Sequence, residues 1–227
     1  MGVSRFNFMG QKLLLFDIDG TLMSSPNFLK EYQIYLGKQF SEYFSRQIKI
    51  DFAGLHGGTE RKNLRILLKR QGLEPDEKQI DDFFLMAGNN YIASKDNSKL
   101  LFGVFKTIKK LSESDLLGVV TGNQDIVARK KLKCVRLNEY FPFGSFGNES
   151  EDRSELVRLA LKRGRNFGWN GNLNSTYVIG DTPTDIESGK FAGTKTVAIT
   201  TGSYSFEDLK KANPDYLIND LSRILTI

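Results

Sequence analysis

The chain has 227 residues, of which 40% are hydrophobic and 26% are charged, and its formal net charge is +5. This length can bury the core of one domain with a sizeable insertion, and the composition excludes a disordered chain. A single cysteine and a single histidine exclude an internal disulfide and a metal site built from several histidines or cysteines, so oxygen atoms remain as metal ligands.

The first predicted element is a strand over residues 12–16, a short apolar run that stops at Asp17-Ile18-Asp19-Gly20. A continuous run of this kind is typical of a strand buried on both faces. The next such run begins about a hundred residues later, far more than one crossover helix requires. The intervening patterns are helical and predict an inserted four-helix cap, with helices at 27–36, 39–47, 59–71 and 77–93.

Beyond the insertion, apolar runs and helical patterns alternate. Strands are expected at 116–120, 176–179, 194–199 and 216–218, and helices at 104–112, 126–137, 153–163, 184–192 and 206–212. This alternation predicts the α/β fold class, a doubly wound parallel, Rossmann-like sheet. We therefore expect a catalytic core of residues 1–22 and 97–227 and a helical cap of residues 23–96.

Polar residues follow three of the predicted strands, at the edge where open α/β sheets bind ligands. At the first strand end, Asp17 and Asp19 are two residues apart on extended backbone, which directs both carboxylates to one side. Two such charges need a cation, and oxygen ligands favour Mg²⁺. The alternative is an acidic turn in which Asp caps a helix and Gly20 is left-handed.

The second strand end reads Thr121-Gly122-Asn123. A hydroxyl group and backbone N–H groups at Gly122 and Asn123, leading into a helix, can hold a phosphate. The alternative is a plain strand-to-helix turn that is capped by the Thr or the Asn side chain.

At the third strand end, Asp181 leaves the strand, Pro183 fits the first helical turn and Asp185 follows about one turn later. Asp181 can complete the metal site, and Asp185 can hold a metal-bound water or a basic side chain. The alternative is a helix start with favourable acidic residues.

In this order, the three strand ends resemble the haloacid dehalogenase superfamily, specifically its phosphatases of the phosphoglycolate-phosphatase type with a helical cap. The resemblance rests on Asp17-x-Asp19-Gly20-Thr21, on Thr121 after a hydrophobic strand, and on Gly180-Asp181-x-x-x-Asp185, and it covers the whole chain. It implies a Mg²⁺-dependent phosphomonoester hydrolase that acts on a small phosphorylated metabolite through an aspartyl-phosphate.

The resemblance also implies roles for individual residues. Asp17 would be the nucleophile, and Asp19 the general acid and base. The metal would be held by Asp17, the backbone carbonyl of Asp19, Asp181 and, directly or in the outer shell, Asp185, while Thr121 would hold the phosphate. Dehalogenation is not expected, because the dehalogenase branch lacks an acid at the position of Asp19.

The family places a basic residue, usually Lys, before the third core helix. Here Arg153 stands at that place and is predicted to bind phosphate, with Lys130 as the alternative. Arg can bind phosphate through two hydrogen bonds, but it cannot shuttle protons. A solvated residue in a first helical turn is the other interpretation of Arg153.

Two other functions remain open: a sugar phosphomutase of the same superfamily, and a non-catalytic phosphate-binding module. The mutase would return the phosphate to a sugar and rely on cap residues that exclude water, but its cap signature is not matched here. In the predicted cap, His56 and Arg61 can face the leaving group or lie on the surface. No cap residue is predicted to be catalytic.

The predicted partner is the small phosphorylated substrate. Basic residues are scattered among acidic ones, and the cluster at 129–133 is interpreted as a solvated helix face, so no nucleic-acid partner is expected. No run approaches the roughly 20 apolar residues that span a bilayer, and the start has no signal-like run. We therefore expect no membrane partner, a cytoplasmic location, and a monomer or homodimer.

Overall fold

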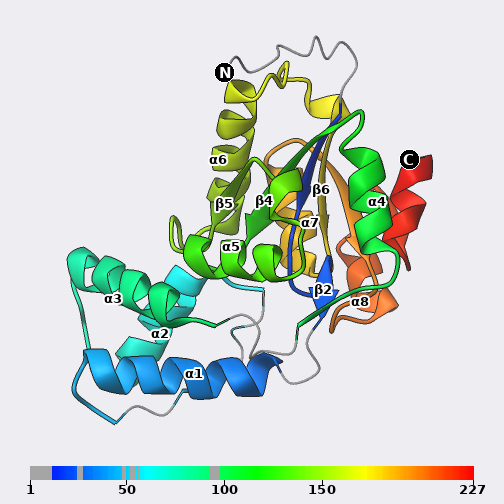
Figure 1. The fold of residues 1–227 in the computed structure, drawn as a ribbon. Coiled ribbons are helices and arrows are strands. Elements are labelled where there is room, and N and C mark those ends of the chain that lie inside the picture. Colours follow the sequence, from blue (N-terminus) through cyan, green and yellow to red (C-terminus); the bar gives the residue numbers. More distant parts are fainter. Residues whose placement is uncertain (1–11, 25–27, 48–49, 52–54, 56, 93–97) are drawn as a thin grey trace.

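A computed structural model of the chain describes residues 12–24, 28–47, 50–51, 55, 57–92 and 98–227. Its centre is a six-stranded parallel sheet in the order β5-β4-β1-β6-β7-β8 (Figure 1). The strands are β1 (Leu13–Phe16), β4 (Leu116–Thr121), β5 (Phe143–Phe146), β6 (Thr176–Gly180), β7 (Lys195–Ile199) and β8 (Tyr216–Ile218). The predicted α/β fold class is confirmed.

Helices cover both faces of the sheet, as continuous apolar strands require. In β1, Leu14 and Phe16 face one apolar cluster, and Leu13 and Leu15 face another. The first cluster includes residues of α4 (Val104–Leu111), α5 (Asp125–Cys134) and the 3₁₀ helix η4 (Leu221–Thr226). The second includes residues of α6 (Arg153–Asn166). The remaining core helices are α7 (Pro183–Phe191), α8 (Phe206–Lys211), η2 (Asn138–Tyr140) and η3 (Leu173–Ser175).

The sequence prediction missed β5. This strand reads Phe-Gly-Ser-Phe, and glycine and serine weaken both the apolar run and the strand propensity. All four residues are nevertheless buried and pair in parallel with β4. A Cβ atom on Gly144 would lie 3.0 Å from the backbone oxygen of Val119, so a side chain at this position would require the neighbouring atoms to shift.

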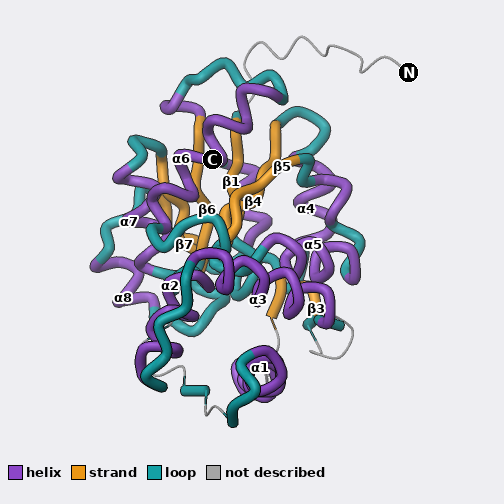
Figure 2. The backbone as a smooth tube through the Cα atoms, turned by 90° about the vertical axis from the view of Figure 1, so that its left-hand side faces the viewer, coloured by secondary structure: helices purple, strands orange, loops and turns teal. Residues whose placement is uncertain are grey.

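Three helices lie beyond the carboxyl end of the sheet (Figures 1 and 2). They are α1 (Phe28–Tyr43), α2 (Glu60–Arg70) and α3 (Glu77–Asn90). Within the described residues there are thus three cap helices, not the four predicted, because α1 continues through the expected break at residues 37–38.

The continuity of α1 follows from its buried stripe. Tyr32, Leu36 and Phe40 recur every four residues and belong to one cluster with Phe83 of α3. Gly37 costs the helix about 1 kcal/mol relative to Ala. Burying Phe40, which is 0% exposed, contributes about 1.5–3 kcal/mol and outweighs that cost.

The chain enters and leaves the region of these helices through a two-stranded pair. β2 (Met23–Ser24) and β3 (Lys99–Leu100) pair antiparallel, so the two crossings lie side by side. The division into a core of 1–22 and 97–227 and a cap of 23–96 stays a prediction. Among the described residues, no helix is both long enough and apolar enough to cross a membrane.

Candidate active site

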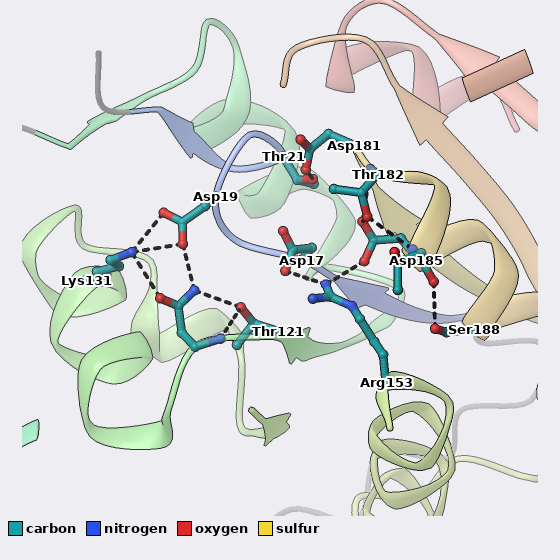
Figure 3. A network of polar contacts seen from close by, with 12 residues as sticks. Asp17, Asp19, Thr21, Thr121, Lys131, Arg153, Asp181, Thr182, Asp185 and Ser188 are labelled. Atoms are coloured by element: carbon teal, nitrogen blue, oxygen red, sulfur yellow. Dashed lines mark hydrogen bonds and ion pairs between the residues drawn. The ribbon is translucent and has the colours of Figure 1, made fainter. Parts of the chain in front are cut away.

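The three polar strand ends meet because their strands are neighbours in the sheet. Asp17 follows β1, Thr121 ends β4 and Asp181 follows β6, and β1 lies between β4 and β6. The backbone N–H of Asp17 donates to the carbonyl of Ile179 at 2.9 Å, which continues the pairing past the end of β1. Figure 3 shows the resulting group of polar side chains.

Three carboxylates form a buried acidic cluster. Asp17, Asp181 and Asp185 each place an oxygen within 4.8 Å of the others, and they are 7%, 5% and 2% exposed. The loop after β1 can approach this cluster because Gly20 has φ +86°, and a Cβ atom there would lie 2.3 Å from Asp181 Oδ2. The predicted neighbours Asp17, Asp181 and Asp185 are therefore brought together.

The start of α7 orients the third carboxylate. Thr182 is the N-cap of α7, and Pro183 occupies the first turn. The hydroxyl and N–H groups of Thr182 donate to Asp185 Oδ2 at 2.8 and 3.1 Å, while the Asp185 N–H donates back to the hydroxyl oxygen. This reciprocal capping box leaves Asp185 Oδ1 for the site.

Arg153 supplies the positive charge beside this cluster. Its Nη2 donates to Asp17 Oδ1 at 2.7 Å and to Asp185 Oδ1 at 2.5 Å. Arg153 stands in the first turn of α6, next to the N-cap Asp152, yet it is only 7% exposed because that turn abuts the strand ends. The interpretation of Arg153 as a solvated surface residue is therefore wrong.

Burial controls the ionisation of the cluster. It raises the pKa of Asp17 to about 7, although Arg153 opposes the shift, and it raises the pKa of Asp181 to about 8 with help from the charges of Asp17 and Asp185. Burial disfavours the charge of Arg153, but Asp185 and Asp17 outweigh it and raise the pKa of Arg153. The cluster therefore holds more acidic groups than one guanidinium compensates.

Asp19 lies in a second network, on the other side of Asp17 in the view of Figure 3. Lys131 Nζ donates to its two carboxylate oxygens at 2.9 and 2.8 Å, and Asn123 Nδ2 donates to Oδ2 at 2.6 Å. Asn123 Nδ2 also donates to Thr121 Oγ1 at 2.9 Å. The predicted phosphate loop and the predicted acid are thus linked through side chains.

The start of α2 docks on this loop. The N–H of Glu60 donates to the carbonyl of Gly122, and the N–H of Arg61 donates to the carbonyl of Gly147, each at 2.8 Å. A Cβ atom on Gly122 would lie 2.5 Å from the carbonyl oxygen of Gly58, so this contact requires glycine. The backbone of Gly122 thereby joins the predicted phosphate loop to the cap.

Glu60 is a half-buried carboxyl group that the sequence prediction did not single out. It accepts a hydrogen bond from the hydroxyl of Tyr32 at 2.6 Å. Burial raises the pKa of Glu60 to about 7, and the hydrogen bond from Tyr32 and the charge of Lys131 offset part of that rise. A Glu directly after the N-cap Thr59 reads as an ordinary helix start, so no sequence signal marked it.

The family model for haloacid dehalogenase-like hydrolases matches residues 14–199. The chain belongs to the haloacid dehalogenase-like hydrolase family. It is similar to the pyrophosphatase PpaX of Oceanobacillus iheyensis, with 24% identity over 224 residues that cover 96% of this chain and 97% of the relative. The predicted membership and the predicted phosphatase type of enzyme are confirmed.

Solved structures of related hydrolases share the fold. A predicted phosphatase from Clostridium acetobutylicum has a TM-score of 0.69 and 21% identity, covering 96% of this chain and 99% of that chain. A predicted phosphoglycolate phosphatase from Haemophilus somnus has a TM-score of 0.67 and 20% identity, covering 97% and 99%. The likeness extends over nearly the whole of each chain.

In this hydrolase, Lys130 lies away from the acidic cluster. Its Nζ donates to the carbonyls of Gly88, Asn89 and Tyr91 at 2.9, 2.7 and 3.0 Å. A lysine at these carbonyls caps the end of α3 and complements its dipole. Arg153, and not the alternative Lys130, therefore contacts Asp17.

The interpretation of the basic cluster at 129–133 as a solvated helix face is wrong for Lys131. Its side chain is 0% exposed, and Val127, Ala128, Lys131 and Leu132 are all buried on α5. This i, i+1, i+4, i+5 spacing is visible in the sequence and marks an inward-facing stripe. Helical periodicity, not composition, was the signal that could have found Lys131.

Two residues of the predicted cap, His56 and Arg61, are candidates for contact with the leaving group. His56 lies outside the described residues. Arg61 forms ion pairs with Glu77 and Asp81, and its Nε donates to the carbonyl of Asn148 at 2.6 Å. These contacts hold α2 to α3 and to the core.

The donor set of the acidic cluster fits a hard divalent cation. Carboxylate oxygens are the ligands that Mg²⁺ prefers. Burial raises the pKa values of Asp17 and Asp181, and the neighbouring carboxylates add to the rise, so a bound cation would favour the ionised forms. Because ligands must be deprotonated, binding of a cation there would release protons.

The raised pKa values of the acidic cluster predict how the stability of the protein depends on pH. Asp17 and Asp181 have pKa values raised from 3.8 in the folded protein, so their contribution to stability is present below about pH 4 and is lost as pH rises through about 7 to 8. We expect the free energy of unfolding of the chelator-treated protein to fall by several kcal/mol between pH 5 and 8, because the folded state keeps two protons that the unfolded chain has released. Urea denaturation measures it.

Added Mg²⁺ is expected to raise the denaturation midpoint more at pH 8 than at pH 5, since fewer protons must be displaced. Ca²⁺ and Na⁺ at matched ionic strength serve as controls for specificity. A midpoint that rises equally at both pH values would contradict binding at these carboxylates.

Proposed function

We propose that the chain is a Mg²⁺-dependent phosphomonoester hydrolase that acts on a small phosphorylated metabolite through an aspartyl-phosphate on Asp17. The observation that carries this proposal is the placement of Asp17 at the end of β1: Asp17 belongs to the acidic cluster and contacts Arg153, and the separate carboxylate of Asp19 lies on its other side (Figure 3). A nucleophile, a charge-balancing group and a proton-transfer group are then available around one point.

The proposed reaction has two displacements. In the first, a carboxylate oxygen of Asp17 attacks phosphorus, the bond from phosphorus to the ester oxygen breaks, and Asp19 protonates the departing alkoxide. In the second, Asp19 takes a proton from water, the resulting hydroxide attacks phosphorus, and the bond to Asp17 breaks. Phosphate leaves and both carboxyl groups regain their starting states, so one difficult step becomes two easier ones.

The phosphate oxygens would be held by Arg153, by the Thr121 hydroxyl and by the loop at Gly122 and Asn123. Arg153 already forms charge-assisted hydrogen bonds to Asp17, and it can share its remaining donors with a phosphate. The Thr121 hydroxyl accepts a hydrogen bond from Asn123 and can donate its own hydrogen.

The Mg²⁺ ion would be held by Asp17, the backbone carbonyl of Asp19, Asp181 and Asp185. Its charge would offset the repulsion between the nucleophile and the phosphate. Asp181 is kept in place by the hydroxyl of Thr21, which donates to its Oδ1 at 3.1 Å.

The cap of residues 23–96 would enclose the leaving group, and the core of 1–22 and 97–227 would hold the reacting atoms. The relatives include proteins named as pyrophosphatases, so an anhydride belongs in the substrate test beside esters such as phosphoglycolate. We propose a cytoplasmic location, where a chain with one cysteine needs no disulfide, and a monomer or homodimer.

The test is phosphate release from phosphoglycolate, other small esters, nucleoside monophosphates, sugar phosphates and pyrophosphate, each with Mg²⁺ and with a chelator. We expect Mg²⁺-dependent release from at least one of the esters. Isomerised sugar phosphates without net release would indicate a phosphomutase. Tight phosphate binding with no turnover of any compound would indicate a binding module.

A further inference from the structure

Lys131 is buried inside the site, although the proposed chemistry does not use it. Its Nζ donates to both carboxylate oxygens of Asp19 and, at 3.1 Å, to Asn123 Oδ1. The Lys131 side chain is 0% exposed, whereas that of Asp19 is 30% exposed. Withdrawing an ammonium group completely from water is costly, and such a group is retained only against a carboxylate and other acceptors.

The contacts of Lys131 restrict the orientation of Asp19. Both carboxylate oxygens accept from Lys131, and one of them also accepts from Asn123. Asn123 is itself tied to Thr121, at the end of β4. The carboxylate of Asp19 accepts hydrogen bonds at both oxygens, from Lys131 on α5 and from Asn123 after β4. It therefore cannot rotate freely about its terminal torsion angle.

α5 gives Lys131 a rigid support. On its buried face, Val127 belongs to the apolar cluster of the cap helices, and Ala128 and Leu132 belong to the cluster of the sheet. Lys131 therefore projects from a helix that is fixed on both sides. A group placed on a packed helix holds its partner more accurately than one placed on a loop.

We propose that Lys131 is a positioning residue that holds the carboxylate of Asp19 for proton transfer. The proposal rests on the proposed role of Asp19 in the phosphatase reaction. A misplacement of about 1 Å at a reacting group can cost 10²-fold in rate. Lys131 would therefore affect turnover without touching the phosphate.

The test compares Lys131→Met, Asp19→Asn, the double variant and Lys133→Met with the wild type, using an alkyl phosphate that needs protonation of its leaving group. Met fills the buried space of Lys, and Lys133 is exposed on the same helix. We expect Lys131→Met to lower kcat about 10- to 100-fold with KM changed less than about threefold. Lys133→Met should match the wild type.

The double variant decides whether Lys131 acts through Asp19. In the Asp19→Asn background, Lys131→Met should lower kcat by less than about twofold further. A loss that multiplies with that of Asp19→Asn would overturn the proposal, because Lys131 would then act through another group such as Glu60. Wild-type kcat in Lys131→Met would overturn it as well.

A stability measurement on the same proteins separates this proposal from the proposed function. If the wild type hydrolyses no phosphate compound, the proposed function fails. Urea denaturation of the wild type, Lys131→Met, Asp19→Asn and the double variant still measures the coupling of Lys131 with Asp19. Non-additive losses support the holding of Asp19 by Lys131 independently of any reaction. Additive losses overturn it.

Discussion

Asp17→Asn is expected to lower turnover on the order of 10⁴-fold or more, to the background of the assay. An amide nitrogen and a neutral carbonyl oxygen cannot form the phosphoenzyme, so the first displacement has no nucleophile. The loss should appear in kcat for every substrate of the panel. Phosphate release at saturating substrate and Mg²⁺ measures it.

The pH dependence of stability tests whether Asp17→Asn is folded, so that misfolding can be excluded as the cause of its lost turnover. Asn is close to the size of Asp and removes one buried acidic group whose pKa is raised to about 7 by burial. The free energy of unfolding of the metal-free variant should therefore fall less between pH 5 and 8 than that of the wild type. Asp208→Asn, exposed on α8, is the matched control. Wild-type turnover in Asp17→Asn would refute the aspartyl-phosphate mechanism.

Arg153→Met is expected to destabilise the protein by about 3 kcal/mol at pH 8, because it leaves buried carboxylates without their guanidinium partner. The loss should be smaller at pH 5, where Asp17 and Asp181 are protonated in the fold because their pKa values are raised to about 7 and about 8. Mg²⁺ should recover part of the loss at pH 8. Urea denaturation with and without chelator measures all three effects.

Arg158→Met is the control for this prediction. Arg158 lies on the same helix as Arg153, and its side chain is 51% exposed in an ion pair with Glu155. Its loss should cost roughly 0.5 kcal/mol or less at either pH. An equal loss for Arg153→Met at pH 5 and 8 would mean that Arg153 contributes by packing and not by charge.

Much of the fold can be predicted from the sequence, because the apolar runs in the sequence are the segments that become buried strands. The run at residues 13–16 is apolar throughout, since β1 is buried on both faces, and the polar loop after it begins where the strand ends. The strand at 216–218 is found where it was expected. Position in the sheet explains why Asp17, Thr121 and Asp181 converge, which their spacing along the chain alone could not show.

The sequence prediction missed β5 and divided α1 into two helices. Both elements have weak local signals in the sequence, which tertiary contacts override. β5 contains glycine and serine and is a strand because β4 pairs with it. α1 passes through Gly37 because its stripe of Tyr32, Leu36 and Phe40 packs on α3. In both cases burial supplies more free energy than the local preference costs.

The sequence by itself determined the α/β order of the core and the acidic and hydroxyl residues at three strand ends. Only the tertiary structure decided between two basic residues, since Arg153 contacts Asp17 while Lys130 caps α3. Helical spacing marks Lys131 as inward-facing, but only the tertiary structure shows that its partner is Asp19. The physical reason is that a long cationic side chain reads as solvated in a sequence, and only its surroundings show whether its charge faces water or a carboxylate.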